Sequence, residues 1–252
     1  MERRGRVLFV TFNRPEARNA MTYDMYERLY TLCDEIDGDP DVRCAVFTGA
    51  GDRAFVAGTD IAEFENLHSA EDALGYERRM DRVFTRLEAV KVPILAAIRG
   101  ACTGGGAGIA ATCDMRIAGP SARFGFPVAR TLGNCLSLAN YARLERLIGP
   151  GAVKQMVFTA QLFDARRMYE LGFLNEVTTS DDAVLERTTE VAELIASNAP
   201  LTIAATKEAL RRTARGQVTG GDDLILGCYT SEDFREGMRA FFEKRPANWR
   251  GK

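Results

Sequence analysis

The chain has 252 residues, of which 46% are hydrophobic and 27% charged, and its formal net charge is −2. This length suffices for one large domain, or one domain with an appendage, around a buried core. So small a net charge provides no general basic field, and we expect neither nucleic acid nor a membrane as a partner. The apolar run at residues 7–10 is too short for a signal peptide, and no stretch approaches the roughly 18 apolar residues of a membrane span. These features predict a cytoplasmic protein.

The six cysteines show no C-x-x-C pairing, and most of them fall in apolar segments. They are Cys33, Cys44, Cys102, Cys113, Cys135 and Cys228. This pattern predicts buried free thiols in a reducing compartment, and no metal site.

The first half of the chain alternates short apolar strands with amphipathic helices. Strands are expected at residues 6–12, 42–48, 92–98, 115–118 and 122–126. Helices are expected at residues 21–36, where Thr22 is the candidate N-cap, and at residues 70–89. From about residue 135 onward we expect helices almost throughout, among them 182–196, 201–214 and 231–243. Strands early and helices late predict an α/β core over residues 1–195, followed by a helical region over residues 196–252.

Two glycine-containing segments, residues 54–64 and 99–108, are each expected to follow a strand and open a helix. Such turns present unpaired backbone N–H groups at the positive end of a helix. Gly104, Gly106 and Gly108 do not form G-x-G-x-x-G, and no lysine follows to make a phosphate loop. One alternative is that the glycines only allow a helix to pack closely on a strand. The other is that two N–H groups converge on one oxygen as an oxyanion hole.

Together with three further motifs, these segments resemble the crotonase (enoyl-CoA hydratase/isomerase) superfamily over nearly the whole chain. The matching motifs are N-R-P-x-x-x-N-A-M at 13–21, F-x-A-G-x-D-I-x-E-F at 55–64, G-x-x-x-G-G-G with C-D at 100–114, S-E-D-x-x-E-G at 231–237 and F-x-E-K-R at 241–245. The resemblance implies a spiral of ββα turns whose C-terminal helices build a homotrimer or hexamer. It also implies an acyl-CoA thioester as ligand, with no cofactor besides the CoA of the substrate.

Carried over position by position, the resemblance makes the backbone N–H groups of Thr59 and Gly105 the oxyanion donors. Residues expected near the CoA are Arg53, Ala57, Asp60 and Ile61, together with Lys244, which would reach the CoA phosphate of a neighbouring subunit. Arg53 and Lys244 could instead be solvated charges, and Asp60 could be a helix N-cap.

The sequence departs from the hydratase pattern at both catalytic glutamates. Gly108 stands at the first position, and Val128 at the second, or Ala129 if the alignment shifts by one residue. Hydration needs one group to deprotonate water and another to protonate the α-carbon. Hydration of crotonyl-CoA is therefore expected to be near the background rate, and glutamates restored at positions 108 and 128 are expected to raise it.

Other polar groups could supply the acid–base chemistry, foremost Arg130 and Asn134 in the segment expected to line the pocket. The remaining candidates are Thr131, Cys135 and Ser137 in that segment, and Glu63 and His68 on the opposite wall. Each could equally pack or cap a helix, and His68 fits an exposed loop better.

Three functions remain open at this point. The favoured one is a lyase or isomerase acting on an enoyl- or related acyl-CoA. A decarboxylase of a malonyl-type thioester would need no base, and Arg130 could hold the departing carboxylate. The third is a protein that binds acyl-CoA without turnover.

Overall fold

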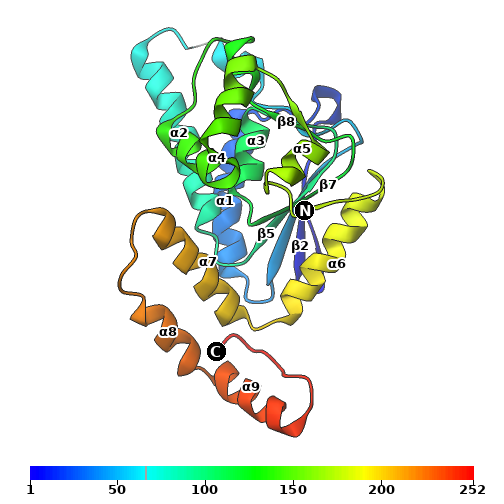
Figure 1. Cartoon of the computed structure of the whole chain (residues 1–252), viewed down its shortest axis with the longest axis vertical. Helices are drawn as coiled ribbons and strands as arrows, with labels where there is room; N and C mark the ends of the chain where they lie inside the picture. The colour runs from blue at the N-terminus through cyan, green and yellow to red at the C-terminus, as the bar shows by residue number, and fades with distance from the viewer. Residues whose placement is uncertain (66) are drawn as a thin grey trace.

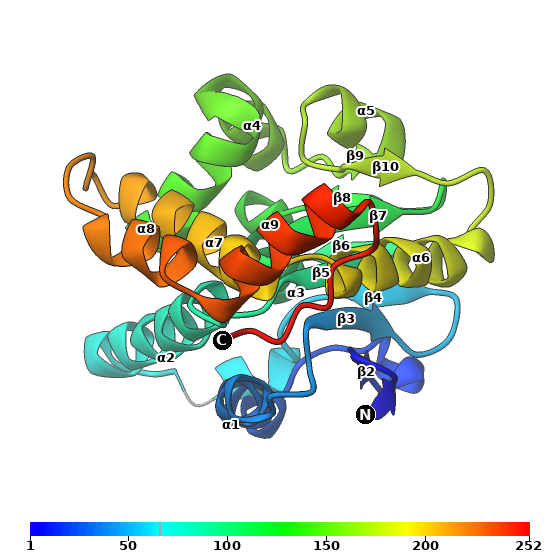
Figure 2. The same cartoon turned by 90° about the horizontal axis from the view of Figure 1, so that it is seen from below.

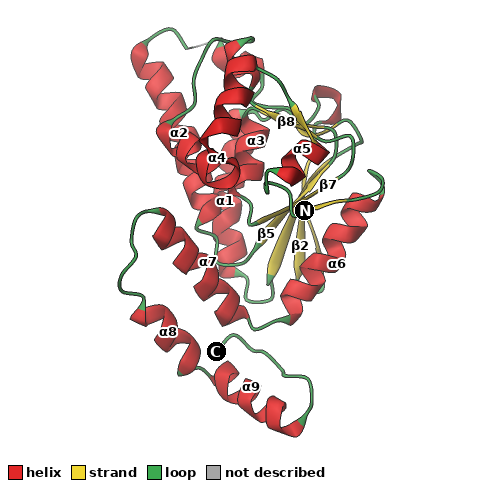
Figure 3. Ribbon diagram, viewed as in Figure 1, coloured by secondary structure: helices red, strands yellow, loops and turns green. Residues whose placement is uncertain are grey.

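The computed structural model describes residues 1–65 and 67–252 as two sheets surrounded by helices (Figures 1 and 3). The strands are β1 (Glu2–Arg4), β2 (Val7–Phe12), β3 (Cys44–Gly49), β4 (Ala54–Val56), β5 (Ile94–Ile98), β6 (Ala101–Thr103), β7 (Met115–Ala118), β8 (Arg123–Gly125), β9 (Phe163–Asp164) and β10 (Glu176–Val177). The α-helices are α1 (Tyr23–Gly38), α2 (Ala70–Glu88), α3 (Gly105–Thr112), α4 (Leu138–Thr159), α5 (Ala165–Glu170), α6 (Ala183–Ser197), α7 (Pro200–Ala214), α8 (Asp222–Tyr229) and α9 (Glu232–Glu243). Short 3-10 helices are η1 (Pro15–Ala17), η2 (Ile61–Phe64) and η3 (Pro127–Ala129).

The chain visits the two sheets in turn. The larger sheet has the order β1-β2-β3-β5-β7-β10, and the smaller one β4-β6-β8-β9. Strand β3 leads to β4 and then α2, β5 leads to β6 and then α3, and β7 leads to β8 and then α4. Each turn of the chain is therefore a ββα unit, which confirms the predicted spiral. The strand numbers rise steadily from one edge of each sheet to the other. A doubly wound sheet would instead show a point at which the strand order reverses.

Alternation along the strands of the larger sheet divides the core into two layers. Phe9 and Val46 pack against α6, whereas Val10 and Phe47 face the main core, to which α1 and α2 contribute. Because side chains of a strand alternate between faces, a sheet covered on both sides requires apolar residues at successive positions. The continuous apolar run of β3 meets this requirement, and every residue of β3 is buried.

The helices begin where their capping residues predict. Thr22 accepts a hydrogen bond from the Met25 N–H (3.3 Å), as expected from the sequence. Ser69 and Asp72 form a reciprocal capping box at the start of α2. Among the described residues, no helix combines the length and apolar character needed to cross a bilayer.

Two short strands lie in the part of the chain that was predicted to be helical. β9 and β10 are two residues each and add to the edges of the two sheets. So short a strand has no detectable period, and only its pairing partner defines it. The burial predicted for the cysteines is also wrong at Cys135, which is exposed, and at Cys228, which is half-buried. Both lie outside the core, on the loop before α4 and on α8.

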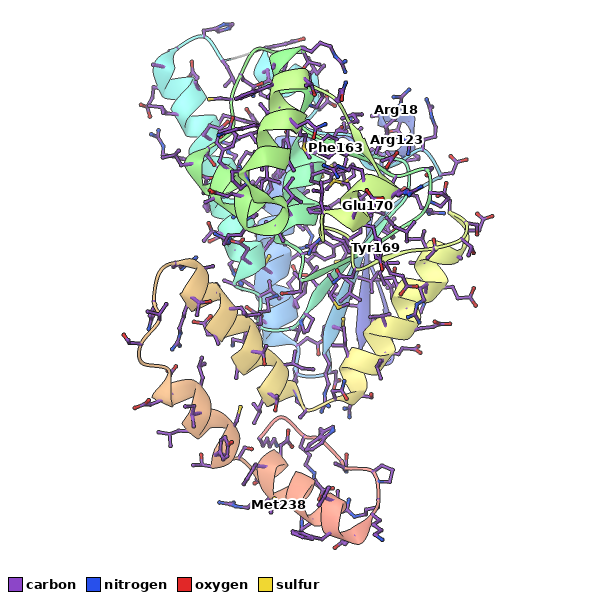
Figure 4. All side chains as sticks on the ribbon, viewed as in Figure 1. Arg18, Arg123, Phe163, Tyr169, Glu170 and Met238 are labelled. Carbon is purple, nitrogen blue, oxygen red and sulfur yellow. The ribbon has the colours of Figure 1, made fainter. Side chains whose placement is uncertain are left out.

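Helices α7–α9 extend beyond the sheets at one end of the molecule, and seen along that direction they lie across the core (Figures 1 and 2). The Lys207 ammonium of α7 ties them to the core, because it donates to the Asp114 carboxylate (2.7 Å) and to the Val92 carbonyl (3.0 Å). Many apolar side chains here are exposed, including Met238 on α9 (Figure 4). The others are Leu210, Ile225, Leu226, Tyr229, Phe234, Phe241 and Phe242.

Candidate active site

The N-terminal motif holds the turn that presents Thr59. Met21 donates its N–H to the Gly58 carbonyl (2.9 Å), and its own carbonyl accepts from the Asp60 N–H (2.8 Å). These bonds clamp the backbone on both sides of Thr59. Within residues 1–65 and 67–252, the Thr59 N–H itself has no hydrogen-bond acceptor.

Side chains of the same motif reinforce this turn. The buried Asn19 amide donates to the carbonyls of Ala50 (3.0 Å) and Ala54 (2.8 Å). Arg14 donates to the Asp60 carboxylate (3.0 Å), which also accepts from the Ala62 N–H (3.2 Å) as the N-cap of η2. The Arg14 hydrogen bond is the main reason that the pKa of Asp60 lies below its usual range. In this chain Asp60 therefore holds the turn, as the N-cap alternative anticipated.

The second turn presents Gly105 at the start of α3. Gly104 has φ 52°, a conformation that favours glycine, and its N–H donates to the Gly125 carbonyl (3.0 Å). Thr103 joins this turn to the first one, because its hydroxyl donates to the Ala57 carbonyl (2.8 Å). The Gly105 N–H, like that of Thr59, finds no acceptor in the described part of the chain. It also lies at the positive end of the α3 dipole.

Both turns open on one cavity of about 210 Å³. Its walls come from the two turns, from α2 and from the segment between β8 and α4. The lining residues are Ala57, Gly58, Thr59, Ile61, Phe64, Tyr76, Glu77, Met80, Phe84, Thr103, Gly104, Gly105, Phe126, Pro127, Val128, Thr131, Leu132, Asn134, Cys135, Leu136 and Asn140. A mostly apolar cleft with a few polar groups is the usual form of a small-molecule site.

Three hydroxyl groups form a hydrogen-bonded chain beside the turns. The Thr59 hydroxyl lies 3.0 Å from the Tyr26 hydroxyl and 3.0 Å from the Tyr76 hydroxyl. Burial raises the pKa of Tyr76 to about 12, and it raises the pKa of the fully buried Tyr26 further. Both phenols are therefore protonated at neutral pH, and they fix the Thr59 side chain without acting as bases.

Comparison with known proteins identifies the family. The enoyl-CoA hydratase/isomerase family model matches residues 2–252. The chain belongs to the enoyl-CoA hydratase/isomerase family. It is 36% identical to the short-chain-enoyl-CoA hydratase of Clostridium acetobutylicum, over 97% of this chain and 94% of that protein. It is also 34% identical to the crotonyl-CoA hydratase of Syntrophomonas wolfei, over 99% and 96% of the two chains.

Solved structures agree with this assignment. The crystal structure of an enoyl-CoA hydratase/carnithine racemase from Magnetospirillum magneticum matches with a TM-score of 0.92 and 30% identity, over 99% of this chain and 94% of that one. An enoyl-CoA hydratase from Bacillus anthracis matches with a TM-score of 0.90 and 28% identity, over 100% and 98%.

The two positions that the resemblance assigns to glutamates differ in their surroundings. Val128 lines the cavity. Gly108 is buried beneath the Phe84 ring, where an added Cβ would lie 2.7 Å from Cζ and 2.8 Å from Cε2. Real Cβ atoms essentially never make such close contacts, so the Phe84 ring would have to shift or be replaced before a glutamate could fit. That glutamates at 108 and 128 raise hydration stays a prediction, and we expect the gain to need a smaller side chain at position 84 as well.

The alternative that the glycines serve close packing applies to Gly106. A Cβ there would lie 2.1 Å from the Val56 carbonyl oxygen of β4. At Gly105 an added Cβ would instead lie 2.0 Å from the Tyr26 hydroxyl, which borders the proposed oxyanion site. Close packing of α3 on β4 therefore accounts for Gly106. At Gly105 a side chain would instead collide with the hydroxyl chain beside the cavity.

The polar candidates from the sequence lie in different places. Asn134, Thr131 and Cys135 line the cavity. The Arg130 side chain is exposed and is not among the lining residues, and the decarboxylase alternative stays untested. Ser137 caps α4.

The two candidates on the opposite wall lie outside the cavity. Glu63 accepts a hydrogen bond from the Tyr23 N–H (3.1 Å) at the start of α1. His68 is exposed just before α2. Neither is a lining residue.

The residues expected to contact CoA are also spread over the surface. Ala57 and Ile61 line the cavity, and Ile61 is 67% exposed at its rim. The Arg53 side chain is exposed. Lys244 is exposed at the C-terminal end of α9, at the opposite end of the molecule from α3 (Figure 1).

Sequence analysis missed one group, the Glu77 carboxyl of α2, which lines the cavity. Burial, supported by the negative charge of Asp81, raises the pKa of Glu77 to about 7, although the Ser137 N–H acts in the opposite direction. A signal existed in the sequence, because Glu77 precedes Met80 and Phe84 by three and seven residues on one helix face. A single carboxylate on an apolar stripe is a sign of function.

Proposed function

We propose that this protein binds an acyl-CoA thioester with its carbonyl oxygen between the N–H groups of Thr59 and Gly105. There it stabilises the enolate that forms when the α-carbon loses a proton. The observation behind this proposal is that two rigidly held N–H groups, which have no acceptor among the described residues, open on one apolar cavity. An unpaired N–H in a buried site is costly unless a ligand satisfies it.

The energetics favour chemistry at the thioester carbonyl. Removing one preorganised oxyanion donor typically costs about 10²–10³-fold in rate, because the donor acts at low dielectric and needs no reorganisation. The α3 dipole adds to this field at Gly105. The mechanism needs no cofactor besides the CoA of the substrate.

The proposed reaction class is proton transfer at the α-carbon, as in a CoA-thioester isomerase or lyase. Gly108 and Val128 supply no acid or base, so a hydration step that uses two carboxylates has no support at these positions. We place the CoA chain over Ala57 and Ile61, with Arg53 near its phosphates.

The C-terminal helices are proposed to form a homotrimer or a pair of trimers, in which Lys244 would approach the CoA of a neighbour. The supporting observation is the set of exposed apolar side chains on α7–α9. Contact of so many apolar side chains with water is unfavourable and marks an interaction surface. Sedimentation at micromolar concentration is expected to show a trimer or hexamer. A Phe241→Asp variant should dissociate it, and a monomeric wild type would contradict the proposal.

Ligand choice provides a direct test of the site. Isothermal titration calorimetry is expected to show binding of acetoacetyl-CoA, whose enolate oxygen suits the two donors, and none of NAD. The physical reason is that the turns at Thr59 and Gly105 lack a complete phosphate-binding signature. Tight NAD binding without acetoacetyl-CoA binding would overturn the proposed function.

A further inference from the structure

We infer that Glu77 is the acid–base group of this site, which takes a proton from the α-carbon of the bound thioester and returns it to the carbon skeleton. The inference rests on the proposed function and adds the residue that moves the proton. Nothing in the motifs of the chain points to this helix.

The placement of Glu77 carries the argument. Tyr76, Glu77, Met80 and Phe84 form the α2 wall of the cavity. Thr59 and Gly105, which would hold the thioester oxygen, line the same cavity. Among the described residues that line the cavity, Glu77 is the only one with a carboxyl group. The same helix thus supplies the ring that covers Gly108 and a carboxyl group that opens on the same cavity.

The charges around Glu77 suit a proton-transfer group. Asp81 lies one helical turn further on, and its carboxylate accepts from the Ser137 hydroxyl (2.6 Å). Burial and, after it, the Asp81 charge oppose ionisation of Glu77, whereas the Ser137 N–H favours it. The other titratable groups on the cavity wall are Tyr76 and Cys135. A pKa of about 7 leaves both forms of Glu77 populated at neutral pH, as general acid–base catalysis requires.

The neighbouring polar groups cannot replace Glu77. Burial raises the pKa of Tyr76 to about 12, so its phenolate is scarce at neutral pH. The Asn134 amide and the Thr131 hydroxyl do not ionise in this range. Cys135 is exposed on the loop before α4.

The proton-transfer step is balanced without any further reactant. The Glu77 carboxylate takes the α-hydrogen as a proton, and the C–H electron pair forms the C=C bond of the enolate. The negative charge moves to the thioester oxygen, between Thr59 and Gly105. The Glu77 carboxyl group then returns the proton to the α-carbon, or to the γ-carbon when the acyl chain has a β,γ double bond.

The test follows 3-butenoyl-CoA in D₂O with wild type and Glu77→Gln. Mass spectrometry measures deuterium uptake, and absorbance measures the conjugated enoyl product. The wild type is expected to exchange and isomerise the substrate, and Glu77→Gln to slow both about 10²–10⁴-fold. The matched control is Glu71→Gln on the same helix, where the carboxylate is exposed and paired with Arg78. This control should behave as the wild type.

Binding separates failure of the inference from failure of the proposed function. If Glu77→Gln binds acetoacetyl-CoA and exchanges at the wild-type rate, Glu77 is not the base. If the wild type binds acetoacetyl-CoA but exchanges nothing, the inference and the proposed proton-transfer reaction both fail, whereas the proposed binding of the thioester stands. If the wild type binds no CoA thioester, the proposed function fails and the inference with it.

The pH profile provides a readout that a structural role would not change. Exchange needs the ionised form of Glu77, so the rate is expected to rise with pH and to reach half its maximum near pH 7. Asp81→Asn removes a like charge and lowers the pKa of Glu77, so the midpoint should move to lower pH. A profile that Asp81→Asn leaves unchanged would contradict the inference.

Discussion

The triple variant Phe84→Leu, Gly108→Glu, Val128→Glu is expected to hydrate crotonyl-CoA at least about 10²-fold faster than the wild type, whose rate should be near background. Each added carboxylate can take one of the two proton-transfer roles in hydration. Leucine at position 84 removes the ring atoms that lie 2.7 and 2.8 Å from a Cβ at position 108, while it keeps an apolar side chain in the core. Loss of enoyl absorbance measures the rate.

The matched control is Gly108→Glu, Val128→Glu with Phe84 retained. It is expected to show no gain in hydration and a lower Tm, because overpacking a well-filled core typically costs about 1–3 kcal/mol. Two results would contradict this account: rapid hydration by the wild type, or equal gains with and without the Phe84 change. Either result would mean that the Phe84 ring is not what prevents a glutamate at position 108 from catalysing hydration.

Gly105→Pro in a Tyr26→Phe background is expected to lower the α-hydrogen exchange of 3-butenoyl-CoA about 10²–10³-fold relative to Tyr26→Phe alone. Proline removes one of the two N–H groups proposed as oxyanion donors, and the first position of a helix accepts its fixed φ. The Tyr26 change is needed because a Cβ at position 105 would lie 2.0 Å from the Tyr26 hydroxyl.

This experiment separates loss of the donor from loss of the fold. Both variants should unfold at similar temperatures, and the affinity for acetoacetyl-CoA should fall together with the exchange rate. Exchange that persists without the Gly105 N–H would exclude it as an oxyanion donor. An equal loss in Tyr26→Phe alone would instead assign the effect to the hydroxyl chain that holds Thr59.

Local patterns in the sequence determined much of the fold. The alternation at residues 7–12 and the Thr22 cap gave correct elements, because strands and helix starts depend on neighbouring residues. The short edge strands β9 and β10 escaped detection, since a two-residue strand exists only through its partner.

The turns at Thr59 and Gly105 could be located from the sequence because each needs glycines where a strand meets a helix. The side chain that could transfer a proton in the cavity could not be located from the sequence. Glu77 belongs to a helix whose sequence also predicts an ordinary packing role, and only the fold places it in the cavity with the two free N–H groups.

By itself, the sequence determined the family and located the two glycine-containing turns, because both depend on short motifs with fixed spacing, and the resemblance to the family implied the ββα spiral. Only the tertiary structure decided which side chains share the cavity with these two turns. It placed the Phe84 ring next to Gly108, left Arg130 at the surface and brought Glu77 to the cavity wall. The physical reason is that burial, and with it the pKa of a carboxyl group, is set by residues far apart in the chain.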